Sequence, residues 1–181
     1  MKIAGGSGAG EDFDGESGVH THMTNTRITD LEIFERRYPV ILREFSIRKG
    51  SGGAGKHCGG DGVIRNIEFR IPMTVSILSE RRVYHPYGLH EGHDAQCGLN
   101  LWIRHVKDAN GNSIARVINL GGKNTARMLA GDRMIVNTPG GGGYGKPSER
   151  DLARKRSPMD PRHAWRGKGS ISTYIDMQET S

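Results

Sequence analysis

The chain has 181 residues, near the usual size of one domain, and its 27 glycines are about twice the usual share. Hydrophobic residues make up only 34% and aromatic residues 6%, which is thin material for an independent core. The net charge of +6 comes mainly from residues 146–169, where eight Lys and Arg face three acidic residues. Such a run is usually a solvated tail, and it lacks the interleaved aromatics that stack on bases, so the composition argues against a nucleic-acid-binding protein.

The N-terminus has no apolar stretch of the kind that forms a signal peptide, and no later apolar run reaches membrane-spanning length. We therefore expect a soluble, cytosolic protein without a membrane partner. Cys58 and Cys97 lie 39 positions apart and form no CxxC pattern. This spacing favours free thiols over a disulfide framework or a structural zinc site.

The most unusual stretch of the chain is residues 18–27, with the sequence GVHTHMTNTR. If it is extended, His20, His22 and Thr24 project from one face, because side chains alternate along a strand. Imidazole titrates nearest to neutral pH, so such a face can bind an anion, carry protons or begin a metal site. The alternative, which the run alone leaves open, is a polar strand face without a chemical role.

A short helix and several strands are predicted after this run. Thr29 and Glu32 have the spacing of a capping box, which predicts a helix over residues 30–37 that Pro39 ends. Alternation of apolar and polar residues predicts strands at 40–48, 63–71 and 73–79. In the first strand Phe45 and Ile47 lie opposite Glu44, Ser46 and Arg48. In the second, Val63, Ile67, Phe69 and Ile71 lie on one side, and in the third Met73, Val75 and Ile77 are expected to face inward.

A hairpin is the strongest local prediction. Residues 99–106 and 113–120 flank an Asn-Gly pair, whose residues readily adopt the positive φ of a tight turn. A last strand is predicted at 133–138. The predicted fold class is mainly β with one short helix (α+β), a β-rich piece with long Gly-rich loops. Residues 1–146 form this part, and residues 147–181 form a basic extended tail, with a short helix or strand near 171–177.

The glycine clusters are candidate ligand loops. Residues 50–57 come within one residue of a P-loop, but His57 follows Lys56 where Ser or Thr is needed, and a strand follows where a helix is needed. A P-loop is therefore rejected, although glycine nests can still offer backbone N–H groups to an anion. Ordering four consecutive glycines is costly, so either this run is disordered or close approach to a ligand or to another segment repays the cost. The candidate anion- or substrate-loop residues are Gly52, Gly53, Gly140, Gly141, Gly142 and Gly143.

A possible metal loop lies between these clusters. His90, His93 and Cys97, with Glu91 and Asp94 between them, offer ligand types that suit zinc. Their spacing matches no specific zinc pattern. A polar surface loop is the favoured interpretation, and we expect no metal in this chain.

In order along nearly the whole chain, these segments resemble the hydantoinase B domain of ATP-dependent 5-oxoprolinases, in particular its C-terminal part in the eukaryotic type. The motifs that carry the resemblance are residues 5–9 (GGSGA), 14–27 (DGESGVHTHMTNTR), 32–39 (EIFERRYP), 51–55 (SGGAG), 59–62 (GGDG), 79–82 (SERR), 85–89 (HPYGL), 121–125 (GGKNT), 131–132 (GD) and 138–145 (TPGGGGYG).

The resemblance implies ATP-driven opening of 5-oxo-L-proline to L-glutamate, a reaction of the glutathione (γ-glutamyl) cycle. The hydantoinase A half would phosphorylate the amide oxygen, and the B half would hydrolyse the activated intermediate. ATP and Mg²⁺ are expected to bind outside this chain. The implied partners are the hydantoinase A half, the N-terminal part of the hydantoinase B domain and a second copy in a homodimer. A site for the intermediate needs proton-transfer groups, so His20, His22, Asn25 and Thr26 are the candidate catalytic residues.

Two departures from the family pattern and three alternatives stay open. Cys58 stands where the family more often has arginine, and Glu91 and His93 fall in a stretch usually richer in glycine. The family's N-terminal portion is absent from this sequence, so we expect the chain alone to be inactive. The alternatives are a related hydantoinase subunit, a ketone carboxylase subunit, or a catalytically inactive interaction fragment.

Overall fold

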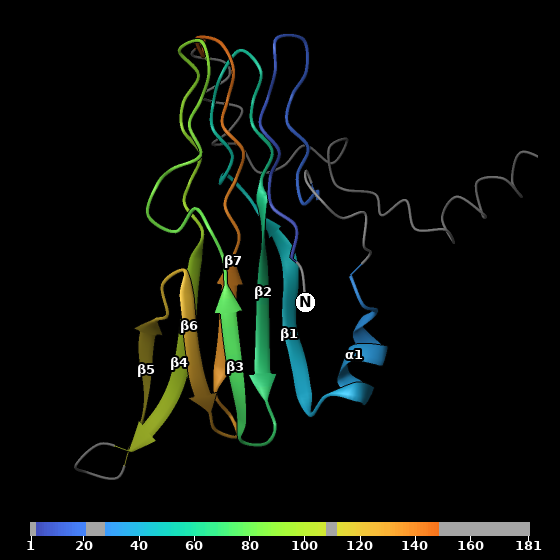
Figure 1. The fold of residues 1–181 in the computed structure, drawn as a ribbon, viewed down its shortest axis with the longest axis vertical. Coiled ribbons are helices and arrows are strands. Elements are labelled where there is room, and N and C mark those ends of the chain that lie inside the picture. The colour runs from blue at the N-terminus through green and yellow to red at the C-terminus, as the bar shows by residue number, and fades with distance from the viewer. Residues whose placement is uncertain (1–2, 21–27, 108–111, 149–181) are drawn as a thin grey trace, which may run out of the picture.

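The computed structural model describes residues 3–20, 28–107 and 112–148 (Figure 1). It is mainly β with one helix, as the sequence predicts. The elements are α1 (Leu31–Arg37), β1 (Val40–Arg48), β2 (Gly62–Phe69), β3 (Met73–Leu78), β4 (Leu99–Lys107), β5 (Ser113–Asn119), β6 (Lys123–Met128) and β7 (Arg133–Asn137). The His/Thr run beyond His20 and the basic tail beyond Ser148 lie outside the described residues.

Five strands form an antiparallel sheet in the order β1-β2-β7-β4-β5. The predicted hairpin is confirmed, since β4 and β5 pair with Lys107 opposite Ser113. The order places β7 between β2 and β4, although β7 follows both in the sequence. The last strand therefore lies in the middle of the sheet. Because β7 is antiparallel to β2 and β4, the glycine-rich segment that follows β7 lies at the same end of the sheet as the loops that precede β2 and β4 (Figure 1).

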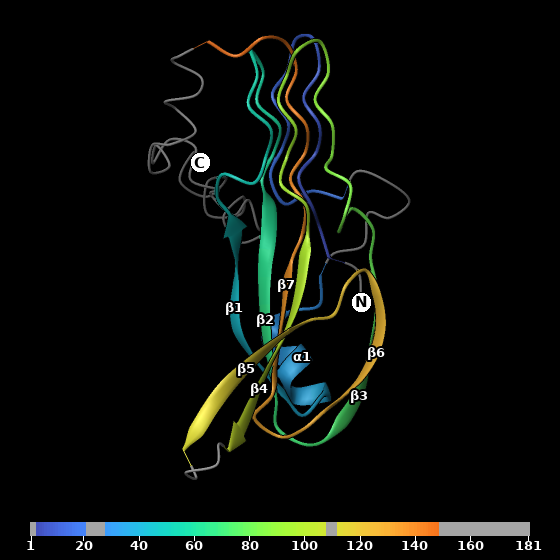
Figure 2. The ribbon, with the colours of Figure 1, turned by 90° about the vertical axis from the view of Figure 1, so that its left-hand side faces the viewer.

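A second, two-stranded sheet of β3 and β6 supplies much of the core (Figure 2). Met128 on β6 is fully buried, and Met73, Val75 and Ile77 on β3 pack against the same cluster, as predicted. The other buried members of the core are Val40, Ile67, Phe69, Leu120, Met134 and Val136. Strand β6 was not predicted from the sequence, because five of its six residues, Lys123–Arg127, show no apolar alternation.

Ile71 does not continue the row of Val63, Ile67 and Phe69, with which the sequence places it on one side of a strand. Strand β2 ends at Phe69, and Ile71 in the following turn is 50% exposed. The backbone N–H of Arg70 donates to the carbonyl of Pro39, and the N–H of Gly131 donates to the carbonyl of Phe69. These bonds end the sheet at this point, so the alternation cannot continue to Ile71.

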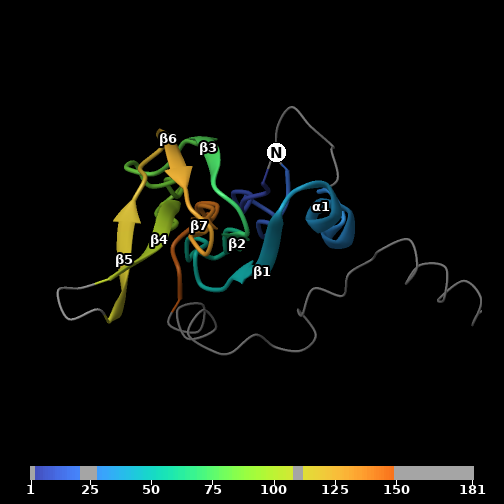
Figure 3. The ribbon, with the colours of Figure 1, turned by 90° about the horizontal axis from the view of Figure 1, so that it is seen from below.

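Helix α1 lies beside β1 at the edge of the five-stranded sheet (Figure 3). Its N-cap is Asp30 and not Thr29, because the Asp30 carboxylate accepts from the backbone N–H groups of Glu32 and Ile33 at 3.0 and 3.4 Å. The capping-box prediction is therefore one residue out of place. None of the helix residues is buried. No helix of the described ranges is long and apolar enough to cross a membrane.

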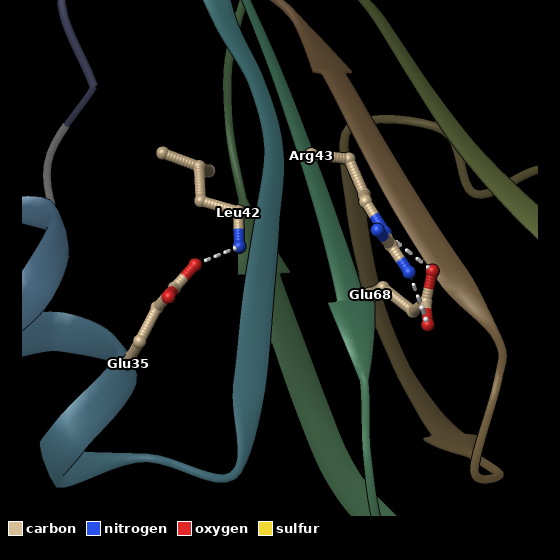
Figure 4. A network of polar contacts seen from close by, with 4 residues as sticks. All are labelled: Glu35, Leu42, Arg43 and Glu68. Atoms are coloured by element: carbon tan, nitrogen blue, oxygen red, sulfur yellow. Dashed lines mark hydrogen bonds and ion pairs between the residues drawn. The ribbon is translucent and has the colours of Figure 1, made fainter.

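Two polar contacts hold β1 in place (Figure 4). The Glu35 carboxylate on α1 accepts from the backbone N–H of Leu42 at 2.7 Å. The register then shifts between Leu42 and Glu44, and the intervening Arg43 forms a bidentate pair with Glu68 on β2, at 2.8 and 3.1 Å. Hydrogen bonding and the charge of Arg43 lower the pKa of Glu68.

This pair predicts a pH dependence. A carboxyl group whose pKa is lower in the folded state stabilises the fold above its unfolded pKa, and the contribution is lost as the pH falls through the folded value. Glu68→Gln is therefore expected to lower the melting temperature at about pH 7 and to have little effect at about pH 2. Thermal unfolding followed by circular dichroism measures both. Arg43→Gln added to Glu68→Gln should cause little further loss, and an equal effect of Glu68→Gln at the two pH values would contradict the assignment.

Candidate functional site

Glycine-rich segments form a bundle beyond one end of the five-stranded sheet (Figures 1 and 2). We call residues 4–19, 51–62, 86–96 and 139–145 the glycine bundle. In a sheet a segment has at most two hydrogen-bonded neighbours, whereas segment 139–145 bonds to all three other segments of the bundle. Representative bonds run from Gly6 N to Pro139 O at 3.0 Å, Gly53 N to Gly141 O at 2.7 Å, Gly141 N to Gly60 O at 2.9 Å and Gly143 N to His93 O at 3.0 Å.

Glycine is required in the bundle because backbones touch where side chains would stand. A Cβ built on Gly141 would overlap the carbonyl oxygen of Ser7, and a Cβ on Gly59 would overlap the carbonyl oxygen of Gly141. Close approach to other segments thus accounts for the run of four glycines. It also explains how a chain with few hydrophobic residues packs, since this half of the molecule is held by backbone hydrogen bonds.

Three polar side chains join the bundle to the sheet. The Asp61 carboxylate accepts from the N–H groups of Gly52 and Gly50, at 2.7 and 3.2 Å. The hydroxyl of Ser51, which is fully buried, accepts from Gly62 N at 2.8 Å. The Thr138 hydroxyl accepts from Val63 N at 2.7 Å. Each acceptor satisfies a buried backbone donor at the point where a strand passes into the bundle.

The structure brings the predicted anion-loop residues together, but it engages their donors. Gly52 donates to Asp61, and the N–H groups of Gly53, Gly140, Gly141 and Gly143 donate to the carbonyls of Gly141, Gln96, Gly60 and His93. The carbonyl of Gly142 accepts from Ala9 N at 2.9 Å. The shared location of these glycines is thus explained by packing. Their role toward an anion or substrate stays a prediction.

The candidate catalytic residues are only partly described. His20 is half-buried and follows Val19, which bridges to Gly5 at the base of the bundle. His22, Asn25 and Thr26 lie outside the described residues. The shared face of His20, His22 and Thr24 and the catalytic role of the four candidates stay predictions.

The possible metal loop has its side chains engaged in separate contacts. The His90 ring lies against Tyr144 with a centroid distance of 4.8 Å. Asp94 accepts from Gly88 N at 2.9 Å, and the Cys97 thiol donates to the carbonyl of Val83 at 3.4 Å. Within the described ranges, no three His, Cys, Asp or Glu side chains gather closely enough to hold a metal ion. Both cysteines are free in the structure, as predicted.

Residues 50–57, which we call the glycine-lysine loop, do not fit a nucleotide. Lys56 N donates to Gly145 O at 3.1 Å and His57 N donates to Tyr144 O at 3.0 Å, so these donors are not turned toward a phosphate. The loop also leads into β2, so no helix N-terminus faces it. We therefore derive no ATP-dependent step from these residues.

Three arginines that are half-buried or fully buried, Arg48, Arg82 and Arg65, were not among the candidates from the sequence. Arg48 donates to the carbonyls of Cys97 and Thr138 and to Gln96 Oε1, at 2.7, 3.1 and 3.0 Å. Arg82 donates to Asn100 Oδ1 at 3.0 Å and to Glu80 O at 2.6 Å, while its buried Nε has no acceptor among the described residues. Burial lowers the pKa of both groups.

Arg65 is the most unusual of them. It is 0% exposed, and none of its three guanidinium nitrogens has an acceptor in the described part of the chain. Its Cζ lies 4.9 Å from the centre of the Phe34 ring and 5.8 Å from that of Phe45. Burial lowers the pKa of Arg65. The alternation in β2 could have revealed this burial, because it places Arg65 on the same face of the strand as the buried residues Val63 and Ile67.

A sequence profile of the Hydantoinase B/oxoprolinase family matches residues 1–147. The chain therefore belongs to this family. An uncharacterized protein of Schizosaccharomyces pombe is 62% identical over 180 residues, which cover 99% of this chain and 13% of that protein. The 5-oxoprolinase of Saccharomyces cerevisiae is 56% identical over 150 residues, covering 80% of this chain and 11% of the enzyme.

A solved structure supports the same assignment. The ATP-dependent caprolactamase from Pseudomonas jessenii superposes with a TM-score of 0.58 at 26% identity, over 85% of this chain and 27% of the caprolactamase chain. The chain thus spans only a small part of the relatives it matches.

Proposed function

We propose that this chain forms part of an ATP-dependent 5-oxoprolinase, which opens the ring of 5-oxo-L-proline to give L-glutamate. The observation that carries the proposal is the 56% identity to the 5-oxoprolinase of Saccharomyces cerevisiae over 80% of the chain. The solved neighbour, described as an ATP-dependent caprolactamase, supports a cyclic amide as the substrate class. By itself the chain is expected to be inactive, because it spans 11% of that 5-oxoprolinase.

The chemistry divides between this chain and the rest of the enzyme. A lactam oxygen is a poor leaving group until it is phosphorylated, so ATP with Mg²⁺ would supply the activation. We assign that step to the hydantoinase A half, because the glycine-lysine loop of this chain does not fit a nucleotide. The partners in this proposal are the hydantoinase A half, the remaining hydantoinase B part and a second copy, in a cytosolic homodimer. The His20 region would then serve hydrolysis of the activated intermediate.

A chimera tests the proposal. The segment of the Saccharomyces cerevisiae enzyme that aligns with this chain is replaced by residues 1–147, and ATP-dependent formation of glutamate from 5-oxo-L-proline is measured. We expect the chimera to keep this activity, because the replaced segment matches in sequence and family. The parent enzyme and a chimera with Gly141→Ala serve as active and misfolded controls.

The alternatives give different outcomes in the same assay. A soluble, folded chimera that opens hydantoin but not 5-oxo-L-proline would favour assignment as a hydantoinase subunit. ATP-dependent carboxylation of acetone would favour assignment as a ketone carboxylase subunit. A folded chimera without any of these activities would leave the inactive interaction fragment as the assignment.

A further inference from the structure

The guanidinium group of Arg65 is a set of donors without acceptors inside the fold. Arg65 lies opposite Phe45 on β1 and opposite Val136 on β7, in the middle of the inward face of the sheet. A guanidinium carries five N–H donors, and all three of its nitrogens are buried without a hydrogen bond to any described residue. A buried cation without an anion destabilises a fold, so Arg65 calls for an acceptor from outside the described residues.

Two phenyl rings form the surroundings of this group. Phe34 from α1 and Phe45 from β1 both lie within cation–π distance of the Arg65 Cζ. Together they offer a small apolar surface beside a planar donor group. This combination suits a ligand that has a short hydrocarbon ring and one carboxylate, which a guanidinium binds through two parallel hydrogen bonds.

The carboxylates of Glu35, Asp132 and Glu68 are engaged in other contacts. Glu35 accepts from Leu42 N, and Asp132 accepts from Trp102 Nε1 at 3.0 Å and from Leu129 N at 2.8 Å. Glu68 pairs with Arg43. An anion for Arg65 therefore has to come from outside these residues.

Helix α1 controls access to Arg65. The helix places Phe34 over the guanidinium, yet none of its seven residues is buried. Elements with few buried side chains open at low cost relative to global unfolding. An outward movement of α1 would uncover the Arg65 donors, at the cost of the contact between Phe34 and the core and of the hydrogen bond from Leu42 N to Glu35.

We propose that Arg65 is a binding residue for the carboxylate of a small cyclic-amide acid, with Phe34 and Phe45 contacting its ring. This inference rests on the proposed function, because 5-oxo-L-proline is a five-membered lactam that carries one carboxylate. Arg65 then selects for lactams with an acid group over neutral lactams, since a neutral ring leaves the buried donors unpaired.

The first test uses the full 181-residue chain. The probe is 5-oxo-L-proline, and the matched ligand is 2-pyrrolidinone, the same ring without the carboxylate. We expect 5-oxo-L-proline to shift the Arg65 Nε–H resonance and to raise the melting temperature, and 2-pyrrolidinone to do neither. Arg65→Met should abolish the response. Arg104→Met is the control, because Arg104 also stacks on an aromatic ring, Trp102, at 5.3 Å.

Three outcomes would overturn the inference. They are an equal response to the neutral lactam, a response that survives in Arg65→Met, and an unresponsive wild-type chain. The last outcome would indicate that Arg65 pairs with a side chain from the rest of the domain. The resonance measurement needs only the wild-type chain, so the inference stays testable if Arg65→Met does not fold.

A second measurement separates this inference from the proposed function. In the active chimera, Arg65→Lys is expected to raise KM for 5-oxo-L-proline about 10- to 100-fold with a smaller change in kcat, because lysine keeps the charge but not the two-point contact. An unchanged KM in an active chimera would overturn the role of Arg65 alone. An inactive chimera beside a carboxylate-dependent shift in the 181-residue chain would overturn the proposed function alone.

Discussion

Replacing Gly141 with alanine is expected to destabilise the chain by about 3 kcal/mol or more, a large part of the about 5–15 kcal/mol that stabilises a typical domain. The added methyl group would overlap the carbonyl oxygen of Ser7 and meet the backbone of Gly8. Neither obstacle is a flexible side chain, so the segments must separate and break the bonds from Gly53 N to Gly141 O and from Gly141 N to Gly60 O. Urea unfolding followed by tryptophan fluorescence measures the loss.

Gly8→Ala is the matched control for this variant. Gly8 lies in the same bundle, but a Cβ there would stand 3.9 Å from its nearest neighbour, the Gly142 carbonyl oxygen, which is ordinary van der Waals contact. We expect Gly8→Ala to change stability by less than about 0.5 kcal/mol. Equal stability of the two variants would contradict backbone-to-backbone packing as the reason for the glycines.

The second large effect is expected at Asn100, a fully buried side chain on β4. Its amide donates to Ser79 Oγ at 2.9 Å and to Gly121 O at 2.7 Å, and its Oδ1 accepts from Arg82 at 3.0 Å. Asn100→Ala leaves the half-buried Arg82 guanidinium with fewer acceptors, beside a buried Nε that already has none among the described residues. We expect a loss of about 3 kcal/mol, because uncompensated buried polar and charged groups are costly.

Asn119→Ala distinguishes this network from a general effect of removing an amide. Asn119 Oδ1 accepts from Gly121 N at 2.9 Å on the exposed surface, so its loss should cost less than about 1 kcal/mol. Urea titrations of both variants give the comparison. A cost at Asn100 no greater than that at Asn119 would show that the buried network around Arg82 contributes little to stability.

Local patterns predicted the elements whose signals lie within a few neighbouring residues. The hairpin of β4 and β5 follows from apolar strands around an Asn-Gly pair, and β3 follows from its alternation. Strand β6 shows why such prediction is incomplete. Its pairing with β3, from Met73 opposite Met128 to Leu78 opposite Lys123, is set by a partner some fifty positions away, and the polar sequence of β6 gives no signal of its own.

The candidate site, too, was predictable from the sequence only in part. The ordered motifs were sufficient to identify the hydantoinase B family, and the matching profile over residues 1–147 confirms it. The sequence left open whether Gly140–Gly143 is disordered or closely approaches a ligand or another segment. It could not decide this, because the neighbours are the backbones of Ser7, Ser51, Ala54 and Tyr87, which come from distant parts of the chain.

The sequence by itself determined the family, the mainly β class and the strands with apolar alternation, since those depend on residue order and local periodicity. Only the tertiary structure decided how the glycine segments bond across the bundle and that Arg65 is buried between Phe34 and Phe45. The physical reason is that burial and hydrogen-bond partners are properties of segments brought together from far along the chain. A charged residue within a strand pattern does not reveal whether water, an anion or an aromatic ring will face it until those segments are in place.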